Sequence, residues 1–400
     1  MRRDLPYLIP YNSASLANIS YNYDYPIDMD LRPRSVPHDR IVQFVMERAI
    51  MSKSAISRRY DSWRDIDRSL TVYINLDEQE TKLKAKDSRK PVSIVVPISY
   101  SIRETLVTYT SSVFLESPYF RYHGVGPEDY YGSILMEQLV QQQCMRNKVA
   151  LNIITQLKDA FAYGIGCVSP QWCVEKGPRR ASFRGPSNIY EVGAFDQEEE
   201  VRFEGNKLVN ISPYNFLPDP NVAIDRVQDG EYVGWINSES CMNLIGREYY
   251  DDTYFNCQYL KHIDGRSRLS GLHDSYLDRY EVGWGDPNWY SKSCDVVYLY
   301  CTIIPKDLGL SSYDRPQKWL FGVAGDEVLV RCQPSHLLHG KYPIAVAAPD
   351  YDGYTVSPIS RLEIAACMQE VQNFLFNSHI ANVRKAVNDV IIYDPTVINP

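Results

Sequence analysis

The most regular pattern in the sequence is residues 360–386, a run without proline or glycine that is rich in Gln and Asn. Hydrophobic positions recur along this run at helical spacing, which predicts an amphipathic helix. About 27 residues at a rise of about 1.5 Å each make a helix of about 40 Å, longer than a helix within one small domain needs. We therefore expect this helix to project from the body of the protein.

The predicted helix has a polar face and, about a quarter turn away, an apolar stripe. The polar face comprises Glu363, Glu370, Asn373, Asn377 and Arg384, and the stripe comprises Ile364, Cys367, Val371, Phe374, Leu375 and Ser378. The pattern predicts a solvated polar face and a packed stripe. Because no strict heptad of Leu and Ile persists, a simple two-stranded coiled coil is not expected. Two interpretations stay open: a helix packed between like helices in a ring, and a long helix at the edge of a globular domain.

Before this helix, the hydrophobic pattern alternates between helical and strand types. Residues 1–37 contain five prolines and show neither helical nor alternating periodicity, so we expect an extended arm. Helices are predicted over residues 39–70 with a break, 98–122 with a turn, 129–161, 238–247 and 253–262. Strands are predicted over residues 92–97, 167–175, 279–304, 316–332 and 341–348, with others inside 176–235.

Glycines punctuate this pattern. Turns are expected at Gly177, Gly185, Gly205 and Gly230 within the strand-rich segment, and Gly164 is expected to close the helix of residues 129–161. The chain is therefore predicted to be of the α+β class, a body of mixed helices and antiparallel strands with a helical projection.

Composition narrows the possible functions. The 400 residues suggest two or three domains, and 44% hydrophobic with 23% charged residues is ordinary for a folded protein. The net charge of −8 argues against a protein that grips nucleic acid through a broad basic surface. An acidic wall repels phosphates, so a conduit along which DNA slides remains compatible with this charge.

The nine cysteines are scattered and never in CxxC spacing, so free thiols are expected rather than disulfides or a zinc site. Cys257 with His262 and His273 comes nearest to a metal cluster, but the spacing fits no standard zinc pattern. No window approaches the 18–20 apolar residues of a membrane helix, and no signal peptide is recognisable. The 31 tyrosines suit subunit contacts or a β-rich fold.

Catalytic motifs are also missing from the sequence. It contains no phosphate-binding loop, and the segment from Gly164 to Gly166 lacks the third glycine of a dinucleotide fingerprint. Asp28 with Asp30 falls in the predicted arm. Asp65 and Asp67 fall on a predicted helix, where positions i and i+2 point apart and cannot share an ion. No catalytic, cofactor-binding or metal-binding residue is predicted.

The succession of segments resembles the portal proteins, or head–tail connectors, of tailed double-stranded DNA bacteriophages. The resemblance lies in Gly340 to Ile344, in Tyr354 with Ser357 to Ser360, in Gln369 to Asn373 with Asn377, and in Asn382 to Lys385. Upstream, residues 64–68, 104–106, 157–166 and 211–216 are similar to portal wing segments. The resemblance divides the chain into an arm (1–37), a wing-like body (38–350), a stem helix with its leading turn (351–387) and the start of a clip domain (388–400).

The resemblance implies a mechanical role in the virion. Portals form a twelve-subunit ring at one capsid vertex, where the genome is packaged and ejected without sequence-specific binding, and carry no active site, cofactor or membrane segment. Terminase, the major capsid protein and tail or adaptor proteins are the implied partners. The implied positions are a channel or subunit boundary (Glu363, Glu370, Asn373, Asn377, Arg384, Lys385), stem packing (Ile364, Val371, Phe374, Leu375) and clip contacts with terminase or an adaptor (Val390, Ile391, Ile392, Tyr393, Asp394).

Portals continue after the clip into a second stem helix, a tunnel loop and a crown, so we expect this chain to be an N-terminal piece. Two alternatives stay open. One is another structural protein of a phage particle, such as a minor capsid or tail-adaptor subunit. The other is a metal-dependent nuclease or transferase whose acidic residues meet only in the folded chain.

Overall fold

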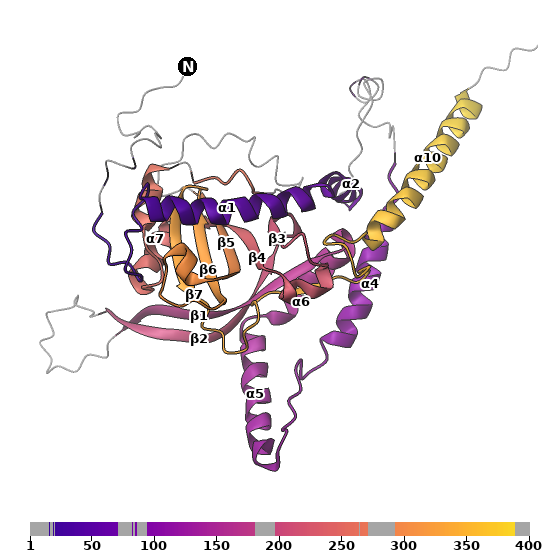
Figure 1. Ribbon diagram of the computed structural model, residues 1–400. Coiled ribbons are helices and arrows are strands. Elements are labelled where there is room, and N and C mark those ends of the chain that lie inside the picture. Colours follow the sequence, from indigo (N-terminus) through magenta and orange to yellow (C-terminus); the bar gives the residue numbers. More distant parts are fainter. Residues whose placement is uncertain are drawn as a thin grey trace, which may run out of the picture.

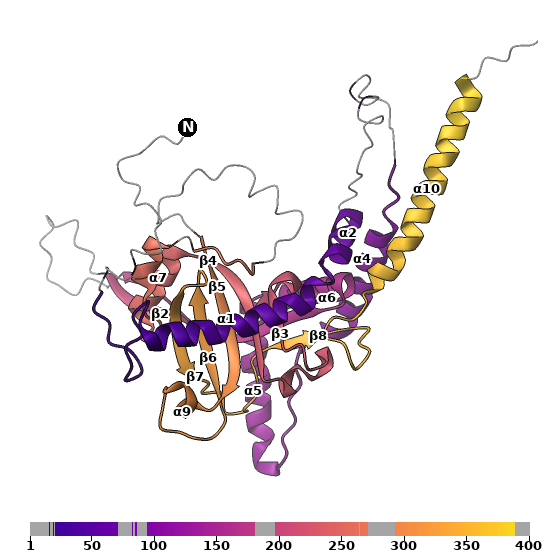
Figure 2. The same cartoon turned by 45° about the horizontal axis from the view of Figure 1, so that its top comes forward.

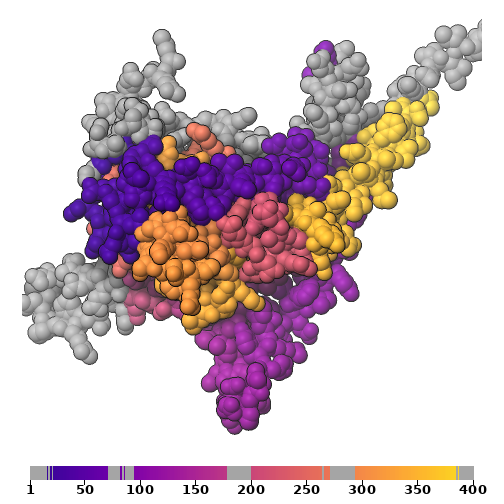
Figure 3. Space-filling view, in the orientation of Figure 1, coloured from indigo at the N-terminus to yellow at the C-terminus, as the bar shows by residue number. Residues whose placement is uncertain are grey.

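The computed structural model describes residues 21–70, 94–180, 197–263, 265–270 and 293–388, with the single residues 16, 19, 82 and 85. Helices and antiparallel sheets are both present, which confirms the α+β class (Figure 1). A body built around two sheets carries two helical projections, which Figure 3 shows standing clear of it. One is the long C-terminal helix and the other is a helical hairpin.

The larger sheet has the strand order β3-β4-β5-β6-β7, all antiparallel. Its strands are β3 (Phe216–Pro218), β4 (Tyr232–Ser240), β5 (Ser293–Ile303), β6 (Gln317–Ala324) and β7 (Val328–Pro334). Side chains alternate across β5: Val297 and Leu299 join one hydrophobic cluster, and Val296 and Tyr298 join the other. The sheet is therefore buried on both faces.

The smaller sheet has the order β2-β1-β8, with β1 (Gly166–Arg180), β2 (Gln197–Ile211) and β8 (Ala345–Ala347). The predicted turns at Gly177 and Gly205 are wrong, because both glycines lie inside these strands, opposite Glu200 and Cys173 respectively. An added Cβ at Gly177 would meet only the flexible end of the Arg202 side chain. The predicted turn at Gly185 lies outside the described residues.

The helices of the body are α1 (Val36–Ser57), α2 (Tyr60–Leu70), α6 (Val149–Tyr163), α7 (Cys241–Tyr250) and the short α9 (Pro305–Leu308). Ile41, Val45, Ala49 and Ile56 recur at helical spacing on the buried side of α1. Figure 2 shows α1 lying across the larger sheet. The predicted break between residues 39 and 70 separates α1 from α2.

The hairpin projection consists of α4 (Ile98–Phe114), a segment that continues outward to the tip, and α5 (Tyr130–Arg146), which returns to the body. The prediction of a single helix over residues 129–161 is wrong, because α5 and α6 are separate helices. The cause is Lys148, whose left-handed backbone (φ 54°) ends one helical path before the next begins. Gly164 caps α6 as predicted, with φ 81°.

The described part of the N-terminal arm is extended, and its side chains alternate. Inward positions from residue 21 to residue 33 are Tyr21, Tyr23, Tyr25, Ile27, Met29, Leu31 and Pro33, while the residues between them are exposed. The expectation of no periodicity was therefore wrong, because the YNYDYPIDMDL run alternates in the sequence itself. The arm is fixed at both ends of this run: Tyr21 Oη meets His262 Nε2 at 3.1 Å, and Asn256 Nδ2 donates to the Leu31 carbonyl at 2.8 Å.

All nine cysteines are free, and Cys367 is the exposed one. Within the described ranges, no three His, Cys, Asp or Glu side chains gather as metal ligands would. Within those ranges, no helix combines the length and the apolarity that crossing a bilayer requires.

Candidate functional site

The site that the sequence singled out is the long helix α10 (Arg361–Asn388), close to the predicted 360–386. Its first turn is a capping box: the Glu363 N–H donates to Ser360 Oγ at 3.0 Å, and the Ser360 N–H donates to a Glu363 carboxylate oxygen at 3.4 Å. The same carboxylate pairs with Arg59, and Arg361 pairs with Asp350. These contacts, with the fully buried Leu362, fix where α10 leaves the body.

Beyond this base, α10 is held to the chain by a row of carboxamide side chains. Gln369 Oε1 accepts a hydrogen bond from the Ser99 N–H at 2.9 Å, and Asn373 Oδ1 accepts one from the Val96 N–H at 2.9 Å. At the next position of the row, Asn377 accepts from the N–H of Ile94 and donates to its carbonyl. A polar row four residues apart thus binds the chain that leads into α4.

The spacing of the two partners explains why this row works. Four residues of helix rise about 6 Å and two residues of extended chain span about 6.6 Å, so carboxamides at 373 and 377 meet N–H groups at 96 and 94. Pro97 has no N–H to satisfy. The predicted strand over residues 92–97 is wrong for its described part, because residues 94–97 pair with no strand. Their backbone groups find side chains of α10 instead.

The apolar residues of α10 lie on the other side of the helix. At about 100° per residue, Ile364, Val371 and Leu375 are roughly opposite the carboxamide row. They are exposed, with Ile364 at 64%, Val371 at 60%, Phe374 at 71% and Leu375 at 60% of full accessibility. Within the single chain, the expectation of a solvated polar face and a packed stripe is therefore reversed. The reason is that the segment at 94–99 presents backbone N–H groups, which polar side chains satisfy.

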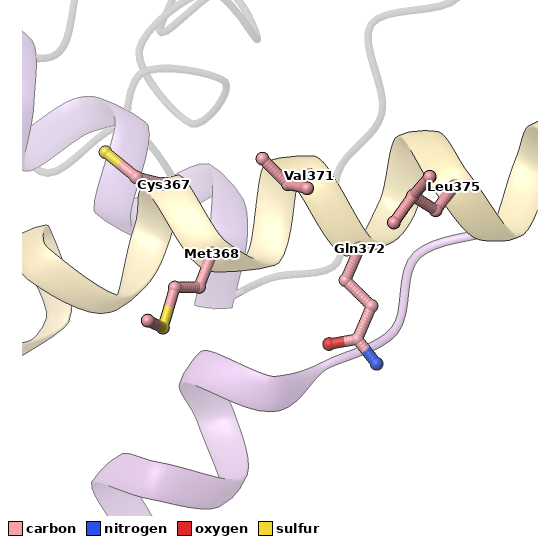
Figure 4. Close-up of a pocket in the computed structure, with 5 residues that line it drawn as sticks. All are labelled: Cys367, Met368, Val371, Gln372 and Leu375. Atoms are coloured by element: carbon pink, nitrogen blue, oxygen red, sulfur yellow. The ribbon is translucent and has the colours of Figure 1, made fainter.

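A shallow hollow marks this apolar face. Its lining is Cys367, Met368, Val371, Gln372 and Leu375, all from α10 itself (Figure 4). Such a hollow is the groove between neighbouring ridges of side chains on one helix, into which the ridges of a second helix can pack. The hollow therefore belongs to the surface of α10 alone.

The other predicted positions differ in what they contact. Glu370 is exposed beside the carboxamide row, while Glu363, Asn373 and Asn377 are engaged within the chain. Arg384 and Lys385 lie on α10, but their side chains are outside the described part of the structure. Val390, Ile391, Ile392, Tyr393 and Asp394 also lie outside the described residues. Gln369 was absent from the predicted polar face, although its spacing of four residues from Asn373 and eight from Asn377 could have revealed it.

A buried aromatic cluster supports the base of α10. Asp67 of α2, which is 2% exposed, accepts hydrogen bonds from Tyr163 Oη at 2.6 Å and Tyr214 Oη at 2.8 Å. Trp63 packs edge-on against both tyrosine rings. Burial, with the Asp67 carboxylate beside it, raises the pKa of Tyr163 well above its ordinary value, so its hydroxyl keeps its proton.

The prediction that Asp65 and Asp67 do not share a site is confirmed. Asp65 is exposed on the surface of α2 and pairs with Arg68 at 3.5 Å, whereas Asp67 binds tyrosines in the core. Asp67 is therefore a structural carboxylate that ties α2 to α6 and to the loop at Tyr214.

Comparison with known proteins does not assign the chain to a family. No protein-family model matches it, and no curated protein sequence shows significant similarity to it.

Proposed function

We propose that this chain is a portal subunit of a tailed bacteriophage, one copy in a twelve-subunit ring at a capsid vertex. The double-stranded genome passes through the ring during packaging by terminase and during ejection. The major capsid protein and the tail or adaptor proteins bind around it. The order of segments in the sequence and the reversed polarity of α10 support this proposal.

The main support for this proposal is the reversed polarity of α10. A helix on the edge of a globular domain turns its apolar side to the core and its polar side to water. Here the polar row of Gln369, Asn373 and Asn377 meets the body, and the side with Ile364, Val371 and Leu375 meets solvent. Exposed apolar side chains in a row are typical of a surface that another molecule covers. A like helix from a neighbouring copy fits the groove of Figure 4.

In this ring the apolar face of each α10 packs on a different side of the α10 helix of the next copy, and polar residues beside it lie at the subunit boundary or toward the channel. Glu370 is an exposed acid among these polar residues. Arg384 and Lys385, near the far end of α10, lie close to passing phosphates or to a neighbour's carboxylates. Residues 390–394 contact terminase or the first tail adaptor. The net charge of −8 suits a channel that repels DNA rather than gripping it.

The proposal is tested by the assembly state of the full chain. Negative-stain images and mass photometry should show closed rings with a central hole and twelvefold or thirteenfold symmetry. The double variant Val371→Asp with Leu375→Asp should reduce ring particles at least tenfold, because it buries carboxylates in the contact. Circular dichroism should stay unchanged, since both side chains are exposed in the single chain.

The matched control is Leu338→Asp, which makes the same kind of change at a fully exposed leucine between β7 and β8 and should leave rings intact. A wild-type chain that stays monomeric, or forms sixfold rings, would favour a minor capsid or adaptor protein. Mg²⁺-dependent cleavage of DNA that a carboxylate substitution abolishes would favour an enzyme.

A further inference from the structure

The hairpin of α4 and α5 repeats the arrangement found on α10. Gln141 Oε1 accepts a hydrogen bond from the Tyr119 N–H at 3.1 Å, and Glu137 accepts one from the Tyr122 N–H at 3.3 Å. Gln141 also donates to Ser117 Oγ at 3.2 Å. As on α10, polar side chains four residues apart bind the backbone of an extended segment that runs beside the helix.

The opposite half of α5 is apolar and exposed. Tyr131, Leu135 and Leu139 follow one another every four residues, and the two leucines lie about a third of a turn or more from Glu137 and Gln141. Their exposed fractions are 77%, 66% and 50%, and Met136 beside them is 49% exposed. Of the 17 residues of α5, only Glu137 and Arg146 carry charge. A projecting helix with this surface is poorly suited to water or to a highly charged partner such as nucleic acid.

The first helix of the hairpin carries a different apolar patch. Tyr109 and Val113 lie four residues apart on α4, and Phe114 follows at its end. Their exposed fractions are 72%, 58% and 65%. The hairpin thus presents two unlike apolar patches, one on each helix, and Figures 1 and 2 show that it projects away from the larger sheet.

We propose that the hairpin is a second contact surface between copies of this chain, in which the α5 patch of one copy packs on the α4 patch of the next. The inference rests on the proposed ring function. A head-to-tail ring brings together two different patches of each subunit, so a chain with two unlike patches on one projection has what such a ring requires. Both α5 and α10 bind a neighbouring backbone segment through polar side chains and expose an apolar face. This similarity supports the same kind of contact for the two exposed faces.

The exposed areas fit this assignment. The four α5 side chains leave on the order of 400 Å² exposed, if a large side chain offers about 170 Å² in full. Ile364, Met368, Val371, Phe374 and Leu375 of α10 leave on the order of 550 Å² on the same basis. A stable interface takes about 800 Å² from each partner, which neither face reaches alone and which the two reach when one copy presents both to the same neighbour.

The test uses two populations of the full chain, both with Cys367→Ser and Cys173→Ser so that the remaining natural thiols are buried. One population carries Leu135→Cys and a larger affinity tag, and the other carries Val113→Cys. A short bismaleimide should link the mixed populations into a heterodimer at least tenfold more than either population alone. Pairing Leu338→Cys with Val113→Cys is the matched control and should give no product.

Rings in negative stain without a cross-link between positions 135 and 113 would overturn the hairpin contact and leave the portal proposal standing. Cross-linking within the Leu135→Cys population alone would replace it with a symmetric contact between α5 helices. A cross-link in the absence of rings would retain the hairpin contact and overturn the portal proposal. If neither rings nor the cross-link appear, the hairpin contact and the portal proposal are both overturned, and the hairpin would then bind a different protein.

Discussion

Asn377 pairs with both backbone groups of Ile94: its Oδ1 accepts from the N–H at 2.9 Å, and its Nδ2 donates to the carbonyl at 3.1 Å. The side chain therefore does what a neighbouring strand does for a residue in a sheet. A carboxamide is required, because a carboxylate lacks the donor and an aliphatic side chain lacks both groups. The chain thus holds a helix 28 residues long without using the helix's apolar face.

We predict that Asn377→Leu weakens the attachment of α10. The substitution leaves the N–H and carbonyl of Ile94 without these partners, which should lower the free energy of unfolding by about 1–3 kcal/mol. Amide hydrogen exchange of the peptide that contains Ile94 and Val96 should accelerate about tenfold. Glu370→Leu is the control on the same helix and should change neither quantity, since Glu370 is exposed. Equal protection in Asn377→Leu and the wild type would contradict the carboxamide row.

A second prediction concerns Asp67. Asp67→Asn keeps the shape of the side chain but replaces one acceptor oxygen with a donor, so the hydroxyl of Tyr163 or Tyr214 loses its acceptor. The free energy of unfolding should fall by about 1–3 kcal/mol, because the hydroxyl left without an acceptor is buried. A urea titration followed by tryptophan fluorescence measures it, as Trp63 packs on both rings. Asp65→Asn, at an exposed position of the same helix, should stay within about 0.5 kcal/mol of the wild type.

A third prediction is a loss of stability in weak acid through His38. The Leu329 N–H donates to His38 Nε2 at 3.1 Å, so Nε2 is unprotonated and Nδ1 carries the proton toward Asp39. Burial lowers the pKa of His38 below its ordinary value of 6.5, and Asp39 offsets this only in part. At pH values between the lowered pKa of the folded chain and 6.5, His38 binds a proton in the unfolded chain but not in the folded chain.

Stability should therefore fall as the pH drops below 6.5, and the loss is complete once the pH passes the lowered pKa of the folded state. Thermal unfolding at several pH values between about 7.5 and about 5 should show a steeper decline for the wild type than for His38→Asn, which does not titrate. His123→Asn, at an exposed histidine, should keep the wild-type slope. A His38→Asn slope equal to the wild type would refute this assignment.

The sequence predicted the long helix well, because a run without glycine or proline fixes the local structure with little help from the rest of the chain. The side of that helix that meets the body could not be read in the same way. It depends on residues 94–99, about 270 positions earlier, whose unpaired N–H groups attract carboxamides rather than aliphatic side chains. Helical periodicity reports that two faces differ, and tertiary contacts decide which one is covered.

Local backbone conformation caused the other errors. Lys148 divides α5 from α6 through a left-handed conformation, and neither Asn147 nor Lys148 is a strong breaker in a sequence. The arm was misread because its alternation uses tyrosine and aspartate rather than valine and a neutral residue. Counting every second position from Tyr21 to Pro33 would have predicted its inward side chains.

In the proposed ring, the carboxamide row affects how quickly copies of the chain join. Because α10 is already anchored in the single chain, its apolar face is ordered before any neighbour arrives. A preordered surface loses little conformational entropy on association, so encounter and docking need no folding step. The same order favours non-specific association, because an exposed apolar face that meets no copy of the chain will adhere to other apolar surfaces.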